Sequence, residues 1–287
     1  MNPSCKFLFF VFLTAGVLLA QQPQNLKVDL DLVLVNATVT DSQNRLVNEL
    51  TIDQFQLFED KVEQPITYFS TEVEPISLGI VFDVSHSMEN KISLAREAAA
   101  TFLEAGTTDD EYFLVEFSNR ARIAEDFTTD INRLRNHLAF LPPKGSTALY
   151  DAVYLGLSKV RKGQNSRKAL LLITDGEDNH SRYSRGDIRE FARESDVQIF
   201  SIDLGRALIG DLSEMTGGNS YRGRVEELQD ICSKIAQELK SQYVLGYVST
   251  NTNTDGKYRK VRVRVNPPAG MTKLNIKAKE GYYGPIK

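Results

Sequence analysis

Apolar runs and helix-like segments alternate through the middle of the chain. Residues 76–82 and 169–173 are short and mostly apolar, which is typical of strands buried on both faces. Between such runs, apolar residues recur every three or four positions, which predicts amphipathic helices. The pattern predicts strands over residues 76–82, 112–117, 169–173 and 197–202, and helices over residues 91–105, 131–140, 147–160, 187–194 and 225–239, with a short helix near residue 212. This order favours a mostly parallel sheet with helices on both faces.

Both flanks of this region have the period-two alternation of β-strands. Residues 26–40 predict a strand, and the apolar pattern continues to residue 69 around a turn at Glu59-Asp60-Lys61. After the helices, the strands predicted are residues 243–248, 258–265 and 274–278, with a hairpin turn at Asn253-Thr254-Asp255-Gly256 between the first two. We therefore expect an α/β fold, a doubly wound mostly parallel sheet of Rossmann type, flanked by a smaller β-sandwich-like unit that the two terminal segments build together.

The first residues have the parts of a secretory signal peptide. Lys6 precedes an uncharged apolar stretch over residues 7–20, and Ala20 is a small residue at a plausible cleavage point. The stretch is short for a membrane span, so we expect cleavage, with an uncleaved anchor as the alternative. The expected organisation is a signal peptide (1–20), an N-terminal β segment (21–75), an α/β domain (76–240) and a C-terminal β segment (241–287).

The charge and the cysteine content limit the partners and the cellular compartment that we expect. Removing residues 1–20 takes away one of 34 basic residues and none of 38 acidic ones, so the formal net charge becomes 33 − 38 = −5. Nucleic acid is therefore not an expected partner. Cys232 would be the single remaining cysteine, and its place in a helical pattern predicts a small buried hydrophobe. We expect a secreted or periplasmic protein without an internal disulfide or a stable membrane span.

Oxygen-bearing side chains follow three of the predicted elements. Asp83, Ser85 and Ser87 come directly after the strand at 76–82, Thr147 opens a helix, and Asp175 follows the strand at 169–173. The carboxyl ends of parallel strands meet in the crevice where open α/β sheets bind ligands, so the five residues can converge there. Because the set contains no Cys or His, it suits Mg²⁺ best, or Ca²⁺ or Mn²⁺. Asp83-x-Ser-x-Ser alone would also fit a strand end followed by a helix N-cap.

This set resembles the metal-ion-dependent adhesion site of the von Willebrand factor type A family, which combines Asp-x-Ser-x-Ser with a distant Thr and a distant Asp. The resemblance implies that Ser85, Ser87 and Thr147 approach the ion most directly, while Asp83 and Asp175 act largely through bound waters. It also implies that the cation, with mostly neutral direct ligands, accepts an Asp or Glu carboxylate of a partner protein.

The flanking segments resemble a narrower group, the von Willebrand factor A-related proteins of Acidobacteria. The segments that carry this resemblance are residues 50–55, Glu59-Asp60 followed by residues 64–66, residues 242–247, and Gly281-Tyr282-Tyr283. The resemblance covers nearly the whole mature chain and implies a bacterial protein that is secreted or periplasmic.

Other chemistries fit the sequence less well. An EF-hand counted from Asp83 would place Met88 where Gly belongs and Leu94 where the bidentate Glu belongs. The sequence has no Gly-x-Ser-x-Gly elbow and no Walker A motif. We therefore interpret His86, His137 and His180 as surface imidazoles and expect a binding module, not an enzyme. The alternatives are a structural module whose cation only ties the loops together and, less favoured, a metal-dependent hydrolase that uses His86 or His180.

Overall fold

The computed structural model describes residues 32–205, 209–271 and 273–286. The predicted signal peptide, and the start of the strand predicted over residues 26–40, lie outside the described residues.

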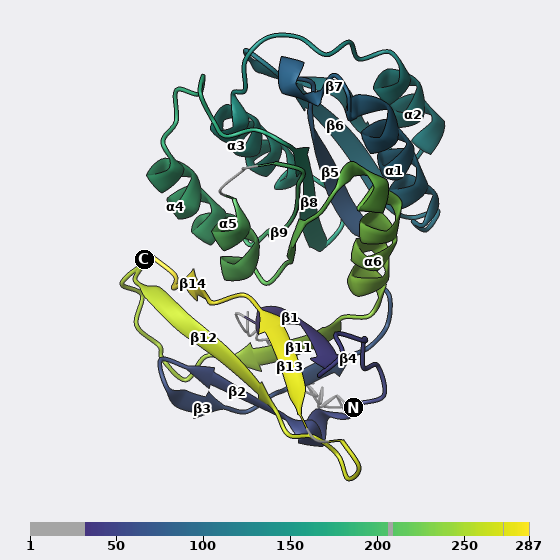
Figure 1. The fold of residues 1–287 in the computed structure, drawn as a ribbon. Coiled ribbons are helices and arrows are strands. Elements are labelled where there is room, and N and C mark those ends of the chain that lie inside the picture. Colours follow the sequence, from purple (N-terminus) through teal and green to yellow (C-terminus); the bar gives the residue numbers. More distant parts are fainter. Residues whose placement is uncertain (1–31, 206–208, 272, 287) are drawn as a thin grey trace, which may run out of the picture. The chain divides into compact units, whose positions relative to one another are not determined.

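A six-stranded sheet forms the centre of the α/β region, in the order β10-β9-β8-β5-β6-β7 (Figure 1). Its strands are β5 (Ile76–Asp83), β6 (Glu111–Phe117), β7 (Ala121–Thr128), β8 (Arg167–Thr174), β9 (Gln198–Asp203) and β10 (Ser220–Arg222). All neighbouring pairs are parallel except β6 and β7, which are antiparallel. The predicted fold class, a mostly parallel sheet within an α/β protein, is confirmed.

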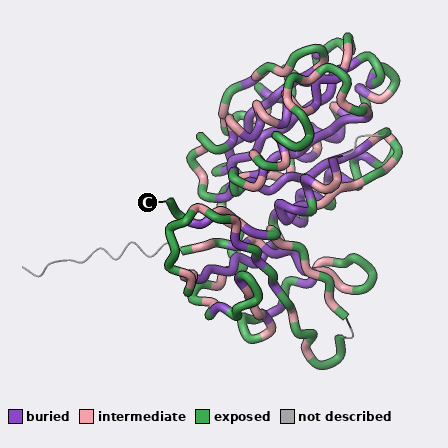
Figure 2. The backbone as a smooth tube through the Cα atoms, turned by 90° about the vertical axis from the view of Figure 1, so that its left-hand side faces the viewer, coloured by how far each residue is buried: buried purple, intermediate pink, exposed green. Residues whose placement is uncertain are grey.

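Helices cover both faces of this sheet. One face carries α1 (Ile92–Glu104), α2 (Ile131–Ala139) and α6 (Leu228–Lys240), and the other carries α3 (Leu149–Val160), α4 (Arg185–Ser195) and α5 (Gly210–Met215) (Figure 1). Successive residues of β5 point to opposite faces, so Ile80 and Phe82 join the first apolar core and Val81 joins the second. Every residue of β5 is consequently buried, and buried segments run through the middle of this region in Figure 2.

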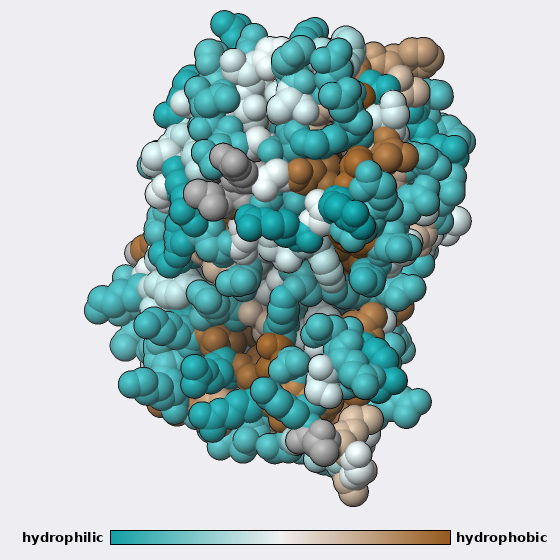
Figure 3. Space-filling model, in the orientation of Figure 1, coloured by the Kyte–Doolittle hydropathy of each residue, from teal (hydrophilic) through white to brown (hydrophobic). Residues whose placement is uncertain are grey.

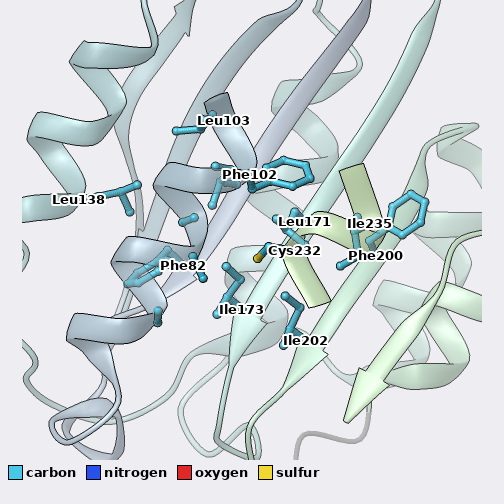
Figure 4. Close-up of a cluster of buried hydrophobic side chains, with 14 of the residues drawn as sticks. Phe82, Phe102, Leu103, Leu138, Leu171, Ile173, Phe200, Ile202, Cys232 and Ile235 are labelled. Carbon is cyan, nitrogen blue, oxygen red and sulfur yellow. The ribbon is translucent and has the colours of Figure 1, made fainter. Parts of the chain in front are cut away.

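Cys232 belongs to the first of these cores. It is fully buried on α6 and lies among Leu171, Ile173 and Ile202 in Figure 4. Each large apolar side chain buried in such a core contributes about 1.5–3 kcal/mol relative to an exposed one. The prediction that this thiol is a small core residue agrees with its surroundings.

The terminal segments form two further four-stranded sheets, with orders β13-β1-β11-β4 and β14-β12-β2-β3. Their strands are β1 (Leu32–Asp41), β2 (Phe55–Glu59), β3 (Val62–Gln64), β4 (Tyr68–Ser70), β11 (Tyr243–Val248), β12 (Tyr258–Val265), β13 (Leu274–Ala278) and β14 (Gly281–Tyr283). Every pairing in them is antiparallel, and each sheet combines strands from both ends of the chain. Their inner faces share one apolar core that includes Val35, Leu57, Tyr243 and Val263.

The hairpin predicted at Asn253–Gly256 is wrong. β11 pairs with β1 and β4, whereas β12 pairs with β2 and β14, so the segment between them crosses from one sheet to the other. Gly256 does have a positive φ of 64°, as the turn residues suggested. Turn chemistry fixes a local reversal of the chain, but the pairing depends on strands elsewhere in the chain, among them β1 and β2, which lie more than two hundred residues earlier.

Strands β7, β10 and β14 were not predicted. The edge strand β7 is only partly buried and carries Arg122, Glu125 and Asp126, so it lacks a continuous apolar run. In contrast, the turn predicted at Glu59-Asp60-Lys61 is present, since Asp60 and Lys61 both have positive φ between the paired strands β2 and β3.

No helix in the described ranges is long and apolar enough to cross a bilayer. The molecular face in Figure 3 is largely hydrophilic, and its hydrophobic side chains form several small patches.

Candidate metal centre

The candidate site lies at the carboxyl ends of the central strands. Asp83 ends β5 and Thr174 ends β8, and these strands are parallel neighbours with Phe82 opposite Ile173. The strand order also reverses at β5, because the chain continues to β6 on one side of it and later to β8 on the other. Ligand sites in open α/β sheets form at such reversals.

Asp83 is fully buried, and both of its carboxylate oxygens accept hydrogen bonds. The Ser85 backbone N–H donates to Oδ1 at 2.7 Å, and the Thr174 hydroxyl donates to Oδ2 at 2.5 Å. Burial raises the pKa of Asp83, and these hydrogen bonds act in the opposite direction. The carboxylate is thereby fixed in one orientation beneath the loop that follows β5.

Ser85, Ser87 and Asp175 extend this polar chain toward the surface. The hydroxyl oxygens of Ser85 and Ser87 are 3.0 Å apart, and the Ser87 hydroxyl donates to Asp175 Oδ1 at 2.7 Å. Ser85 is 1% exposed and Asp175 is 7% exposed, whereas Ser87 is exposed to solvent. The cluster therefore meets solvent at Ser87.

Thr147, the fifth predicted residue, is buried beside the loop that follows β8. A Cβ atom placed on Gly176 would lie 3.1 Å from Thr147 Oγ1, so the hydroxyl lies close to the residue after Asp175. Asn179 forms hydrogen bonds with both backbone groups of Thr147. Its Oδ1 accepts from Thr147 N–H at 2.9 Å, and its own N–H donates to the Thr147 carbonyl at 3.0 Å. The structure thus brings all five predicted residues to one end of the sheet.

The loop before Thr147 is held by a further asparagine, which the sequence did not single out. Gly145 has a φ of 77°, a conformation that favours glycine, and the next N–H, that of Ser146, donates to Asn119 Oδ1 at 2.6 Å. Asn119 follows β6, so its role depends on the adjacency of β6 and β5.

Lys91 was also missed, and it is the charged neighbour of the site. Its ammonium forms an ion pair with Asp175 Oδ2, and the Asp175 side chain is 1% exposed against 32% for Lys91. Lys91 is the N-cap residue of α1 and its side chain takes no part in capping. The sequence feature that could have identified Lys91 as a neighbour of the site is its position at the start of a predicted helix, eight residues after Asp83.

The histidines do not join the cluster. The His86 side chain is 77% exposed, with its Nδ1 3.8 Å from Glu89, and His137 pairs with Glu125 at 2.9 Å. His180 is exposed. Across the part of the chain that the structure describes, no hydrogen bond joins a histidine ring to Asp83, Ser85 or Ser87.

The donor chemistry fits a hard divalent cation. Three hydroxyls and two carboxylates are oxygen donors of the kind that Mg²⁺ and Ca²⁺ use. The described residues contain no group of three or more His, Cys, Asp and Glu side chains able to hold a metal ion, so a cation at this site would need the hydroxyl oxygens of Ser85, Ser87 and Thr147 among its ligands. Both oxygens of Asp83 already accept protein hydrogen bonds, which agrees with a carboxylate that acts through water.

Comparisons with known proteins agree with this domain type. The model of the von Willebrand factor type A domain matches residues 78–177. An uncharacterized protein of Borreliella burgdorferi is 24% identical over 162 residues, which cover 53% of this chain and 47% of that protein. An uncharacterized protein of Synechocystis sp. is 29% identical over 119 residues, which cover 39% of this chain and 27% of that protein. The chain thus spans less than half the length of these relatives.

One similar solved structure is proximal thread matrix protein 1 from the mussel byssus, described as having a zinc-occupied MIDAS (metal-ion-dependent adhesion site) motif. It has a TM-score of 0.52 and 17% identity, and the match covers 63% of this chain and 49% of that one. At this identity the likeness shows the fold alone. The narrower resemblance to acidobacterial proteins stays a prediction.

Proposed function

Because the chain carries a von Willebrand factor type A domain over residues 78–177, we propose that it is a secreted or periplasmic protein-binding module with a divalent cation at its centre. Asp83, Ser85, Ser87, Thr147 and Asp175 hold the cation, which is Mg²⁺ or else Ca²⁺ or Mn²⁺. When bound, the ion supplies a Lewis-acidic position for an Asp or Glu carboxylate of a partner protein. Binding, not catalysis, is the activity proposed.

One observation carries this proposal. A continuous hydrogen-bonded chain runs from Thr174 through Asp83, Ser85 and Ser87 to Asp175, and it is buried except at Ser87. The buried end fixes the donors, because every side chain there already has a partner. The exposed end gives a large partner access to the ion without any movement of the sheet.

Isothermal titration of the full chain with Mg²⁺ tests the proposal. The Ser87→Ala protein should bind Mg²⁺ about tenfold more weakly or worse, since it lacks one hydroxyl donor of the set. Ser42→Ala is the matched control, because Ser42 is an exposed turn serine of the β region, and its Mg²⁺ affinity should equal that of the unsubstituted chain. Absence of Mg²⁺, Ca²⁺ and Mn²⁺ binding to the unsubstituted chain would overturn the proposal.

A structural role for the cation is the second candidate. It is favoured by the way the cluster already links the loops after β5 and β8 through the hydrogen bond between Ser87 and Asp175. An affinity capture of partners with and without EDTA separates the two. Partner binding that survives EDTA, while the melting temperature falls, would favour the structural role.

A further inference from the structure

Lys91 places a positive charge inside the candidate cation site. Its ammonium pairs with Asp175 Oδ2, while the other oxygen of that carboxylate accepts from Ser87. The Asp175 carboxylate therefore interacts with the serine hydroxyls through one oxygen and with the Lys91 ammonium through the other. The start of α1 uses the backbone of Lys91, whose N–H donates to the Met88 carbonyl and whose carbonyl accepts from the Ala95 N–H, while its side chain makes no capping hydrogen bond.

The formal charge of the site follows from three groups. Asp83 and Asp175 contribute −2 and Lys91 contributes +1, so the protein side of the site carries −1. A divalent cation brings the loaded site to +1, whereas the same site without Lys91 would be neutral when loaded. These charges interact more strongly than they would in water, because Asp83 is fully buried and the Asp175 side chain is nearly so.

The remaining charges on the site loops do not cancel this difference. They include both signs. Glu89, Lys144 and Glu177 are exposed to solvent, where salt screens them. Asp178 is partly buried, and its carboxylate accepts from the Tyr150 N–H and the Ser181 hydroxyl at the start of α3.

We infer that Lys91 is a specificity-determining residue of this site, which weakens the hold on the cation and leaves the loaded site with a net positive charge that selects an anionic ligand. The inference rests on the proposed cation site and deepens it. It implies that the Lys91 ammonium lowers the affinity of the site for the cation and raises the affinity of the loaded site for a carboxylate. Without the ammonium, the two carboxylates attract a cation more strongly, but the neutral loaded site attracts a carboxylate less strongly.

The test replaces Lys91 with an uncharged side chain of similar length. Calorimetry on the full chain measures Mg²⁺ affinity first, and then the affinity of the Mg²⁺-loaded protein for acetate as the probe carboxylate. For Lys91→Met we expect Mg²⁺ affinity to rise about threefold to tenfold and acetate affinity to fall by a similar factor, the range being modest because Lys91 is partly exposed.

Two further variants serve as controls. Lys91→Arg keeps the charge but changes the shape of the side chain, and it should retain both affinities within about twofold. Retained affinities would attribute the effect of Lys91→Met to the lost charge and not to altered packing. Lys162→Met removes an exposed lysine after the last turn of α3 and should change neither affinity. Circular dichroism melts confirm that each variant is folded.

The outcomes separate the inference from the proposed function. If the unsubstituted chain binds no divalent cation, the proposed function fails. If it binds Mg²⁺ but Lys91→Met changes neither affinity, or lowers both together, the cation site stands and the role inferred for Lys91 is overturned.

Discussion

A buried carboxylate needs hydrogen-bond donors on both oxygens, and Asp83 obtains one of them from a neighbouring strand. The Thr174 hydroxyl reaches Asp83 Oδ2 at 2.5 Å because β5 and β8 are adjacent and in register. The sequence identified Asp83 and Asp175 as site residues from their place after apolar runs. It could not assign a role to Thr174, because that role depends on which two strands are neighbours.

Replacing Thr174 with valine should destabilise the protein by about 1–3 kcal/mol. The substitution keeps the side-chain shape but removes the hydroxyl that donates to Oδ2 of the fully buried Asp83 carboxylate, while the Ser85 N–H still donates to Oδ1. Urea denaturation followed by circular dichroism measures the free energy of unfolding. Thr101→Val in α1 is the control, because the Thr101 hydroxyl donates only to the Glu97 carbonyl of the same helix at an exposed position. Equal small losses in both variants would show that Asp83 does not depend on Thr174.

Cys232 gives a second prediction at this scale, through pH. Burial raises the pKa of its thiol from 9.0 to about 12. Because the folded-state pKa lies above the unfolded value, the thiol's contribution to stability is fully present below about pH 9 and is lost as the pH rises toward 12. The loss amounts to about 1.4 kcal/mol per pH unit within that window.

Urea unfolding of the unsubstituted chain and of Cys232→Ala at several pH values between 9 and 11 tests this. The alanine protein should be less stable by a constant packing term, but its stability should fall less steeply with pH. The buried tyrosines titrate alike in both proteins, so the difference in slope isolates the thiol. Parallel curves would mean that Cys232 already ionises in the folded state near its ordinary pKa.

At the scale of elements, helix α3 receives its N-terminal caps from a loop that follows another strand. Its N-cap residue, Ala148, has no side chain able to cap. Instead, Asp178 Oδ1 accepts from Tyr150 N–H at 3.2 Å, and the Ser181 hydroxyl accepts from Asp151 N–H at 2.9 Å. These side chains satisfy helix-end donors that would otherwise lack partners. The loop after β8 therefore fixes both Asp175 and the start of the helix that follows Thr147.

The periodicity predicted this helix from residue 147, but the helix begins at Leu149. Apolar spacing determines the buried face of a helix, whereas its first residue depends on capping groups. Here the caps lie about thirty residues later in the sequence, so no local signal could reveal them. The same holds for Asn179, whose contacts with Thr147 join these two loops.

Removing the Asp178 cap should therefore affect both stability and cation binding. We expect Asp178→Ala to cost about 0.5–2 kcal/mol of unfolding free energy and to weaken Mg²⁺ binding, because the loop that holds Thr147 and Asp175 loosens. Asp130→Ala is the matched control. Asp130 caps its own helix, α2, by accepting from Asn132 N–H at 3.0 Å, so it should cost similar stability without changing Mg²⁺ affinity. Weakened Mg²⁺ binding in both variants would point to a general loss of stability instead.

At the scale of the whole molecule, the chain leaves the terminal β-sheets once and returns once. The alternation of apolar and polar residues predicted strands in both terminal segments, and their pairing was expected because the two segments flank the α/β region. The register could not be predicted. Val35 pairs with Leu245 and Leu57 with Val263, across sequence separations for which a single sequence holds no signal.

Arg167, at the start of β8, connects the two points where the chain passes between the β-sheets and the α/β region. Its guanidinium donates to the carbonyl of Glu74, just before β5, at 2.9 Å, and to the carbonyl of Leu239, near the end of α6, at 2.6 Å. It also donates to Gln242 Oε1, just before β11, at 2.9 Å. Burial lowers the pKa of Arg167, but an arginine remains charged under all ordinary conditions. One buried cation thus satisfies acceptors from both connections.

Replacing Arg167 with methionine should cost about 2 kcal/mol or more, because it leaves three acceptors without their donor where water has little access. Arg262→Met, at an exposed position of β12, is the control and should change stability by less than about 0.5 kcal/mol. Urea unfolding should be followed by circular dichroism and by tyrosine fluorescence, since the protein has no tryptophan. If Arg167 couples the two regions, the two probes should give one transition in the unsubstituted chain and separate midpoints in the Arg167→Met protein. A single transition with an unchanged midpoint in both variants would show that the connections keep their structure without this guanidinium.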